Sequence, residues 1–196
     1  MCFRCVLKKL NSMPAKQDLS KFNNSWYVPG AGFFKRTCWY FINSFFFNSS
    51  FPINGIKVFL FKCFGGKAGK DVIIKPNVNI KYPWRLQLGN HVWIGENVWI
   101  DNLDDVIIES NVCISQGALL LCGNHNFKKS SFDLITGKII LKEGSWIGAK
   151  CVVGPNVIVD ENAILQVGSV ATKNLDANGI YRGNPAIKIG ERNFYD

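Results

Sequence analysis

An aliphatic or small residue recurs at every sixth position of the chain from residue 68 onward. The positions form five groups of three: Ala68, Ile74, Ile80; Leu88, Ile94, Ile100; Ile108, Ile114, Leu120; Leu141, Ile147, Val153; and Val159, Leu165, Ala171. A second small or branched residue usually follows four positions later. A period of six is neither helical nor a simple strand alternation. It predicts a solenoid with three flat faces, one hexad to a face, whose leading residues point into a continuous core.

The corners between these faces carry residues suited to tight turns. Asn77, Asn97, Asn111 and Asn156 stand at corners, where the backbone often needs a positive φ. The spacing lengthens after the third hexad of the first three coils, always at the same corner. The longest insertion is a protruding loop at about 122–140. A long loop that leaves a rigid solenoid is where function is expected.

The remaining segments frame this repeat. We expect a basic, aromatic and partly helical cap segment at 1–66, a β-helix at 67–173, and a tail at 174–196 that ends in a short helix. Two short helices are predicted at 33–47 and 54–64. They contain too many apolar residues for isolated surface helices. They either cover the open edge of the first coil or dock on a membrane surface, and the sequence leaves both readings open.

Positive charge is concentrated in the first third of the chain. Residues 1–66 hold nine of the 23 Lys and Arg residues and one of the 14 acids, so they carry +8 of the total +9. Basic and aromatic together, this segment suggests peripheral association with a membrane surface or another anionic partner. We expect no nucleic-acid partner.

The seven cysteines are odd in number and scattered, which favours free thiols in a reducing compartment. Cys2 and Cys5 form a single C-x-x-C pair, so a zinc site is not expected. The N-terminus lacks the apolar stretch of a signal peptide. The apolar run at 33–47 is shorter than the ~20 residues that span a bilayer. We therefore expect a cytoplasmic protein, at the inner face of the membrane if the first segment docks there.

The two histidines differ in their place in the repeat. His91 lies within a hexad, where a solvated surface residue is the simplest interpretation. His125 lies where the long loop leaves the solenoid. Acyl transfer to a hydroxyl needs a base for the hydroxyl proton and donors for the thioester oxygen, and neutral imidazole suits the base. Gamma-class carbonic anhydrases share the six-residue repeat but use three metal-binding histidines, so no metal is expected here.

Ten segments resemble the hexapeptide-repeat acyltransferases, in particular the subgroup typified by the colanic acid biosynthesis acetyltransferase WcaF. These segments are DLSKF at 18–22, NSWY at 24–27, IKYPW at 80–84, VWIGENVWID at 92–101, CISQG at 113–117, GNH at 123–125, SFDLI at 131–135, WIGAK at 146–150, GSVATK at 168–173 and GNPA at 183–186. The hexads alone indicate the fold. The GNH, WIGA and SVATK motifs together are specific for the branch that uses coenzyme A.

The resemblance implies a left-handed parallel β-helix, a homotrimer with active sites at the subunit clefts, and acetyl-CoA as the acyl donor. Its members act on sugars in surface or exopolysaccharide assembly. His125 matches the catalytic base, and the backbone N–H of Ala149 matches the donor to the thioester oxygen. The residues that match the coenzyme A site are Gly148, Ala149, Val167, Thr172, Lys173, Pro185 and Lys188.

Three positions depart from the family pattern. Asn126 replaces an Asp after the base, Val167 replaces an Ala beside the pantetheine arm, and Gly95 stands where galactoside and maltose enzymes carry an acceptor-binding Asn. Acceptor choice therefore cannot be copied from those enzymes. Our candidates for acceptor contacts are Tyr82, Trp84, Trp99, Asp101, Asn102 and Trp146. The aromatic candidates could equally pack against the cap or a neighbouring subunit.

Two other functions stay open. The same base and groove could serve an amine, which would make the protein an N-acetyltransferase for an amino sugar. The chain could also be a non-catalytic trimeric scaffold that binds membranes or partners through residues 1–66. The features at His125, Ala149 and Thr172–Lys173 together argue against the scaffold, whereas nothing in the sequence excludes an amine acceptor.

Overall fold

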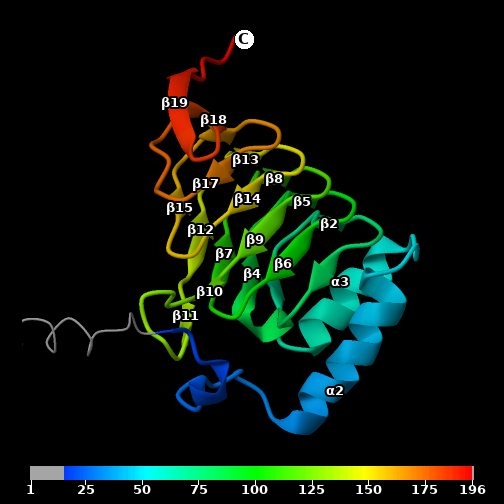
Figure 1. The fold of residues 1–196 in the computed structure, drawn as a ribbon. Coiled ribbons are helices and arrows are strands. Elements are labelled where there is room, and N and C mark those ends of the chain that lie inside the picture. Colours follow the sequence, from blue (N-terminus) through cyan, green and yellow to red (C-terminus); the bar gives the residue numbers. More distant parts are fainter. Residues whose placement is uncertain (1–15, 196) are drawn as a thin grey trace, which may run out of the picture. The chain divides into compact units, whose positions relative to one another are not determined.

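Three parallel β-sheets wind into a left-handed β-helix (Figure 1). The computed structural model describes residues 16–195. Residues 28–124 and 136–195 form one compact unit, which contains the solenoid. Residues 16–27 and 125–135 form a second, smaller unit.

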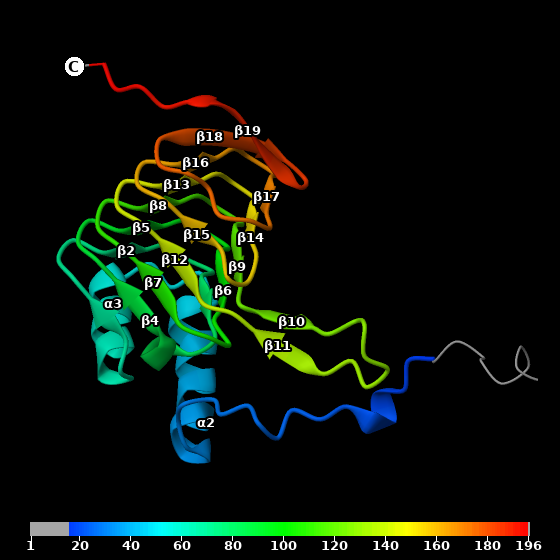
Figure 2. The same ribbon diagram turned by 90° about the vertical axis from the view of Figure 1, so that its left-hand side faces the viewer.

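Each coil of the solenoid contributes one short strand to each sheet. The first sheet contains β1 (Lys67–Ala68), β4 (Leu86–Leu88), β7 (Val106–Ile108), β12 (Ile139–Leu141) and β15 (Ile158–Val159). The second contains β2 (Ile73–Ile74), β5 (Trp93–Ile94), β8 (Cys113–Ile114), β13 (Trp146–Ile147), β16 (Ile164–Leu165) and β18 (Gly179–Gly183), with β19 (Ala186–Glu191) at its edge. The third contains β3 (Asn79–Ile80), β6 (Trp99–Asp101), β9 (Leu119–Leu121), β14 (Val152–Val153) and β17 (Val170–Ala171). Figure 2 shows β4, β7, β12 and β15 side by side.

The predicted β-helix is confirmed, and its core follows the six-residue period. Ile74, Ile94, Ile114, Ile147 and Leu165 stack in register through the second sheet. Nearly all leading hexad residues are buried, since each points inward from a strand that pairs with the coil above and below. The corner asparagines adopt the left-handed backbone that their positions predict, with φ of 58° to 62°.

Two helices cover the first coil. Helix α2 (Phe33–Ile42) continues as a π-helical turn, η2 (Asn43–Phe47), and is followed by α3 (Asn54–Cys63). These lie where the sequence predicts helices. Trp39, Phe47 and Phe61 belong to the same buried core as the hexad residues. Within residues 16–195, no helix is long and apolar enough to cross a bilayer.

Side chains of these helices pair with the open edge of the first coil. Asn54 accepts the N–H of Ile74 and donates to the carbonyl of Val72, both at 2.8 Å. Asn43 accepts the N–H of Ile80 at 3.1 Å, and the indole of Trp39 donates to the carbonyl of the same residue at 2.8 Å. An unpaired strand edge would expose these backbone groups, so the helices supply the hydrogen bonds that a preceding coil would make.

The predicted C-terminal helix is wrong. Residues 179–183 instead form β18, which pairs in parallel with β16, and β19 returns antiparallel to it. The last coil leaves the edge of β16 open, and the backbone of β18 satisfies that edge. Tyr181 lies opposite Leu165 and is buried, so it closes the core at this end.

The smaller unit is built on a short helix and a turn. Helix η1 (Leu19–Lys21) begins after Asp18, whose side chain accepts the N–H of Ser20. The backbone N–H of Asp18 donates to the carbonyl of Ser130 at 2.8 Å. The loop itself is flanked by β10 (Gly123–His125) and β11 (Leu134–Thr136), which form a two-stranded sheet. The Cys2–Cys5 pair and the N-terminus examined for a signal peptide lie outside the described residues.

Candidate active site

His125 ends strand β10, and the following loop fixes its imidazole. Its Nδ1 lies 2.9 Å from the carbonyl oxygen of Phe132. A carbonyl oxygen can only accept, so Nδ1 carries the hydrogen and donates it. In the neutral ring, Nε2 is then the nitrogen that can take a proton. The Phe132 ring stacks on the imidazole with centroids 4.4 Å apart and planes 6° apart.

A strained turn holds that carbonyl in place. Phe132 has a φ of 52°, which is uncommon for an aromatic residue. The N–H of Asn126 donates to the carbonyl of Asp133 at 2.8 Å, and its side-chain oxygen accepts the N–H of Lys128 at 3.2 Å. The amide therefore orders the loop at the position where the family pattern has an Asp. Lys129 donates to the Asp133 carboxylate at 3.1 Å, and this hydrogen bond lowers the pKa of that carboxyl.

Four predicted site residues line one cavity of about 540 Å³ over the second sheet. They are Trp146, Gly148, Ala149 and Val167. The indole of Trp146 donates to the hydroxyl of Ser115 at 2.9 Å, which fixes the ring at the cavity wall. The structure thus places Trp146 beside the predicted coenzyme A residues.

Gly148 and Ala149 shape the floor of this cavity. A Cβ on Gly148 would lie 2.7 Å from the carbonyl oxygen of Leu165 and from the nitrogen of Val167, so a larger residue would push the coils apart. The carbonyl of Ala149 accepts the N–H of Gly168 at 2.9 Å. Its own N–H donates to no protein group among residues 16–195. The cavity therefore contains a backbone donor that a ligand oxygen could use.

The other predicted coenzyme A residues lie outside this cavity. Thr172 and Lys173 follow β17 and are exposed. Pro185 lies in the turn between β18 and β19. Lys188 lies on β19, with its Nζ 2.7 Å from Glu191 Oε1, and this ion pair raises the pKa of the lysine.

Two acceptor candidates line a second cavity, of about 370 Å³, between α2–η2 and the first coils. Tyr82 and Trp99 contribute aromatic surface, and Arg36 and Lys81 contribute positive charge. Lys81 Nζ lies 2.7 Å from the carboxylate of Asp101, which is another of the predicted acceptor residues. Arg36 Nε is buried with no hydrogen-bond partner in the described part of the chain.

Asn102 and Trp84 have clear structural partners. Asn102 is fully buried, and its amide accepts the N–H of Tyr82 at 2.9 Å and donates to the carbonyl of the same residue at 2.6 Å. Trp84, on the short helix η3 (Pro83–Arg85), donates from its indole to the carbonyl of Pro29 at 2.7 Å. Lys35 lies over the Trp84 ring at 5.0 Å. Both side chains are therefore accounted for by contacts within the chain.

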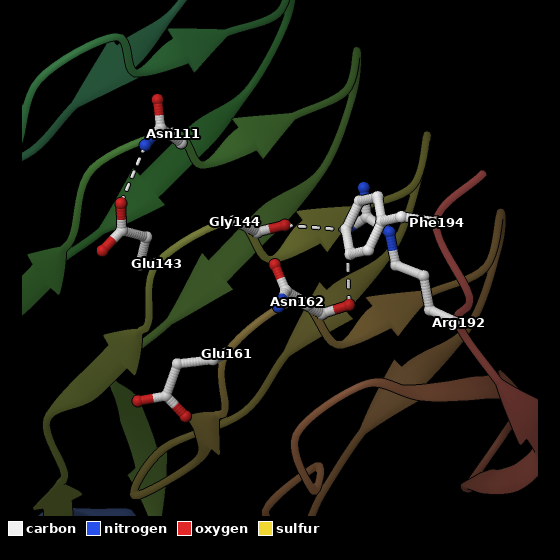
Figure 3. Close-up of a pocket in the computed structure, with 7 residues that line it drawn as sticks. All are labelled: Asn111, Glu143, Gly144, Glu161, Asn162, Arg192 and Phe194. Atoms are coloured by element: carbon white, nitrogen blue, oxygen red, sulfur yellow. Dashed lines mark hydrogen bonds between the residues drawn. The ribbon is translucent and has the colours of Figure 1, made fainter. Parts of the chain in front are cut away.

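A further cavity contains none of the predicted site residues (Figure 3). Arg192 donates to the carbonyls of Gly144 and Asn162 there, at 2.8 and 3.3 Å. Its guanidinium also lies over the Phe194 ring at 4.5 Å. These contacts tie the C-terminal tail to the corners of two coils. We assign this cavity a structural role.

Sequence reasoning missed Ser115, Gln116 and Arg36 as lining residues. Ser115 and Gln116 occupy the same corner as Gly148 and Ala149, one coil earlier. The register of the hexads therefore predicts that the two pairs lie side by side. The sequence does not indicate a cavity at Arg36, because this residue lies outside the hexads, in a helix that is predicted to cover the first coil. Among residues 16–195 there is no group of three His, Cys, Asp or Glu side chains that could hold a metal ion.

Comparison with known proteins relates most of the chain to one family. No protein-family profile matches the sequence. The protein assigned as colanic acid biosynthesis acetyltransferase WcaF of Escherichia coli (strain K12) is 33% identical over 177 residues, which cover 90% of this chain and 97% of that protein. The galactoside O-acetyltransferase of the same strain is 27% identical over 131 residues, covering 65% of this chain and 64% of the relative.

Solved structures share the fold. A galactoside acetyltransferase in complex with coenzyme A superimposes with a TM-score of 0.72 at 24% identity and covers 81% of each chain. A hexapeptide-repeat acetyltransferase of Vibrio cholerae O1 biovar eltor, complexed with acetyl coenzyme A, has a TM-score of 0.73 at 17% identity and covers 80% of this chain and 86% of the other. With the WcaF similarity extending over nearly its full length, the chain belongs to the hexapeptide-repeat acyltransferase family, as a WcaF-type member.

Proposed function

We propose that this protein is an acetyl-CoA-dependent O-acetyltransferase that acts on a sugar or glycan intermediate of surface or exopolysaccharide biosynthesis. The observation that carries the proposal is the cavity in which Trp146, Gly148, Ala149 and Val167 meet. The named function of the WcaF relative and the coenzyme A ligands of the structural relatives support it. We propose a homotrimer that works in the cytoplasm, at the inner face of the membrane.

The cavity suits the pantetheine arm and thioester of acetyl-CoA. Its wall is largely apolar side chain, while its corner offers the backbone N–H of Ala149. That N–H would donate to the thioester oxygen, where negative charge grows during transfer. Val167 is exposed beside it and would narrow the channel for the arm. Thr172, Lys173, Pro185 and Lys188 would contact the nucleotide end, where lysine ammonium groups complement phosphate.

His125 would act as the general base. Its Nδ1–H donates to the Phe132 carbonyl, so Nε2 is the nitrogen that would take the proton of the acceptor hydroxyl. The hydroxyl oxygen then bonds to the acetyl carbon while the carbon–sulfur bond breaks. The imidazolium returns its proton to the departing thiolate, which leaves an acetyl ester, free coenzyme A and neutral His125. No acyl-enzyme is required.

The cavity between α2–η2 and the first coils is the proposed acceptor site. Tyr82 and Trp99 would pack against the apolar faces of a sugar ring, and Trp146 would border the reacting end. Asp101 would act through Lys81, to which it is paired. Arg36 Nε is a buried donor that an acceptor oxygen would satisfy. Trp84 and Asn102 would support these residues without touching the acceptor.

The test is to replace each histidine by asparagine. Asparagine at 125 keeps a donor for the Phe132 carbonyl but has no basic nitrogen, so we expect turnover with acetyl-CoA to fall by ~10²–10⁴ while acetyl-CoA binding by calorimetry is unchanged. His91→Asn is the matched control: His91 is exposed, and asparagine tolerates its φ of 55°. Full turnover by His125→Asn would remove the residue from the role.

The same assay separates ester from amide products. Acceptors with only hydroxyl groups are compared with amino sugars, and the products are treated with alkaline hydroxylamine, which cleaves acetyl esters but not acetamides. We expect hydroxylamine-labile product. A hydroxylamine-stable product formed only from amino sugars would replace O-acetylation by N-acetylation. Absence of acetyl-CoA binding by the folded wild type would instead favour the scaffold.

A further inference from the structure

Helix α2 and the turn η2 expose a stripe of apolar side chains on the side that faces away from the solenoid. Their inward stripe, with Trp39, Asn43 and Phe47, pairs with the first coil. The opposite stripe follows helical spacing and consists of Phe33, Phe34, Tyr40, Phe41 and Phe45. A surface helix of a soluble domain normally turns polar residues outward. Here both stripes are apolar, and only one of them has a partner among the described residues.

Helix α3 repeats this arrangement. Lys57 and Phe61 point inward and are fully buried, while Ile56 and Phe59 lie on the outward stripe with Lys62. We call Phe33, Phe34, Tyr40, Phe41, Phe45, Ile56 and Phe59 together the aromatic face. Its six aromatic side chains are 55 to 81% exposed. Isolated exposed apolar residues are ordinary, but a group of this size on two adjoining helices marks an interaction surface.

The charge around the aromatic face points to the kind of partner. Residues 28–66 contain Lys35, Arg36, Lys57 and Lys62 and not one Asp or Glu. Lys57 is buried, and Arg36 lines the second cavity with its Nε buried. Lys35 lies over the Trp84 ring, so Lys62 is the exposed cation beside the aromatic face. Phenylalanine and tyrosine flanked only by cations are the composition of helices that lie in the interface of an anionic bilayer. Neither helix can cross a bilayer, so contact would be with one leaflet only.

We propose that the aromatic face binds the surface of a bilayer that contains anionic lipid. The phenylalanine rings enter the boundary between headgroups and acyl chains, and the side chain of Lys62 extends to the phosphates. This binding needs neither acetyl-CoA nor an acceptor, although Tyr40 of the aromatic face also lines the proposed acceptor cavity. It would hold the β-helix, whose first coil the same helices cover, at a membrane surface.

The test is flotation of the full-length protein with vesicles of phosphatidylcholine, alone or mixed with phosphatidylglycerol. We expect flotation with the mixed vesicles and weaker flotation at high salt, because screening weakens the contact between cations and headgroups. The combined variant Phe34→Ser, Phe41→Ser and Phe59→Ser should lose binding at least tenfold. The matched control is Phe127→Ser, Ile187→Ser and Tyr195→Ser, which removes three exposed apolar side chains outside the aromatic face.

Circular dichroism and sedimentation velocity test whether the two triple variants keep the fold and the oligomeric state. Wild-type protein that stays out of the vesicle fraction would overturn the proposal, as would equal binding by the two triple variants. A fall in oligomer mass on changing the aromatic face, without vesicle binding by the wild type, would show that a second copy covers it. The histidine variants test acetyl transfer by turnover, and the triple variants test membrane binding by flotation. Each of the two proposals can therefore be contradicted without the other.

Discussion

Lys57 is a charged residue of helix α3 that is buried where the helix covers the first coil. Its side chain is fully buried, and its ammonium group donates to the carbonyls of Lys75 and Ile74 at 2.9 and 3.4 Å. These carbonyls belong to the open edge of β2, where a preceding coil would otherwise supply N–H groups. Burial favours the uncharged amine, so the pKa of Lys57 is lowered from its usual 10.5.

This pKa shift predicts how stability changes in alkaline solution. Between the lowered folded-state pKa and 10.5, the unfolded chain binds more protons at Lys57 than the folded chain does, so the free energy of unfolding rises with pH in that window. Lys57→Met removes this dependence. Urea unfolding of both proteins from pH 7 to pH 10 should show the difference moving in favour of the wild type as pH rises. A difference that moves the other way would mean that the two carbonyls outweigh burial.

Candidate site residues can be named from the sequence only where the repeat or a motif places the residue. His125 stands at the insertion corner, and Ala149 belongs to the WIGA motif, so both could be named as candidates from the sequence. Asn102 and Trp84 are different, because their partners are Tyr82, 20 positions away, and Pro29, 55 positions away. A spacing of 20 is one coil of the solenoid, so the repeat places Asn102 beside Tyr82, although it does not reveal that the amide pairs with the backbone there. The contact between Trp84 and Pro29 follows no repeat. Both residues therefore read as site candidates, although the structure engages them in packing.

At the scale of elements, α2, η2 and α3 take the place of a missing coil. Asn54 stands opposite β2, and Asn43 stands opposite β3, so each amide pairs with a strand that has no neighbour on that side. Helical spacing brings these polar residues inward beside Trp39 and Phe61. A solenoid needs such a terminal cover, because its first strands would otherwise expose unpaired backbone groups.

Asn54→Ala tests this cover. It removes both hydrogen bonds to β2 and leaves a partly buried N–H and carbonyl unsatisfied, which should lower the free energy of unfolding by ~1–3 kcal/mol. Asn48→Ala, at an exposed position, is the control and should change stability little. Urea unfolding followed by circular dichroism measures both. Equal effects of the two substitutions would show that the Asn54 bonds do not stabilise the edge.

The elements differ in how clearly the sequence reveals them. The hexads are predictable because every leading residue enters the same core, so position and residue type are tied together. In strand β19, position and residue type are not linked in this way. Ile187 and Ile189 are exposed, and the strand is held mainly by its backbone pairing to β18. A short segment with scattered apolar residues also fits a helix, which is why the tail was predicted wrongly.

At the scale of the whole molecule, the solenoid is a stack that must be closed at both ends. Each coil contacts its neighbours, so the core is continuous from Phe61 near the first coil to Tyr181 beyond the last. The two ends use different means. Helices with polar inward side chains close the first, and the β18–β19 hairpin closes the second by extending the sheet. Damage at either end should therefore lower the stability of the entire stack.

Tyr181 is the residue with which to test closure at the C-terminal end. Its ring is almost fully buried, and its hydroxyl donates to the Asp176 carboxylate at 3.0 Å and accepts the N–H of Asp176 at 2.9 Å. Tyr181→Phe loses only these hydrogen bonds and should cost ~0.5–1.5 kcal/mol. Tyr181→Ala also opens a cavity over the last coil and should cost ~3–5 kcal/mol.

Urea unfolding monitored by circular dichroism gives both free energies, and size-exclusion chromatography shows whether the alanine variant self-associates through the loosened edge of β16. If the stack unfolds as one unit, a single transition should shift to lower urea with its slope unchanged. A second, earlier transition in Tyr181→Ala would show instead that the last coil melts separately. An alanine variant no less stable than the phenylalanine variant would mean that the ring does not close the core.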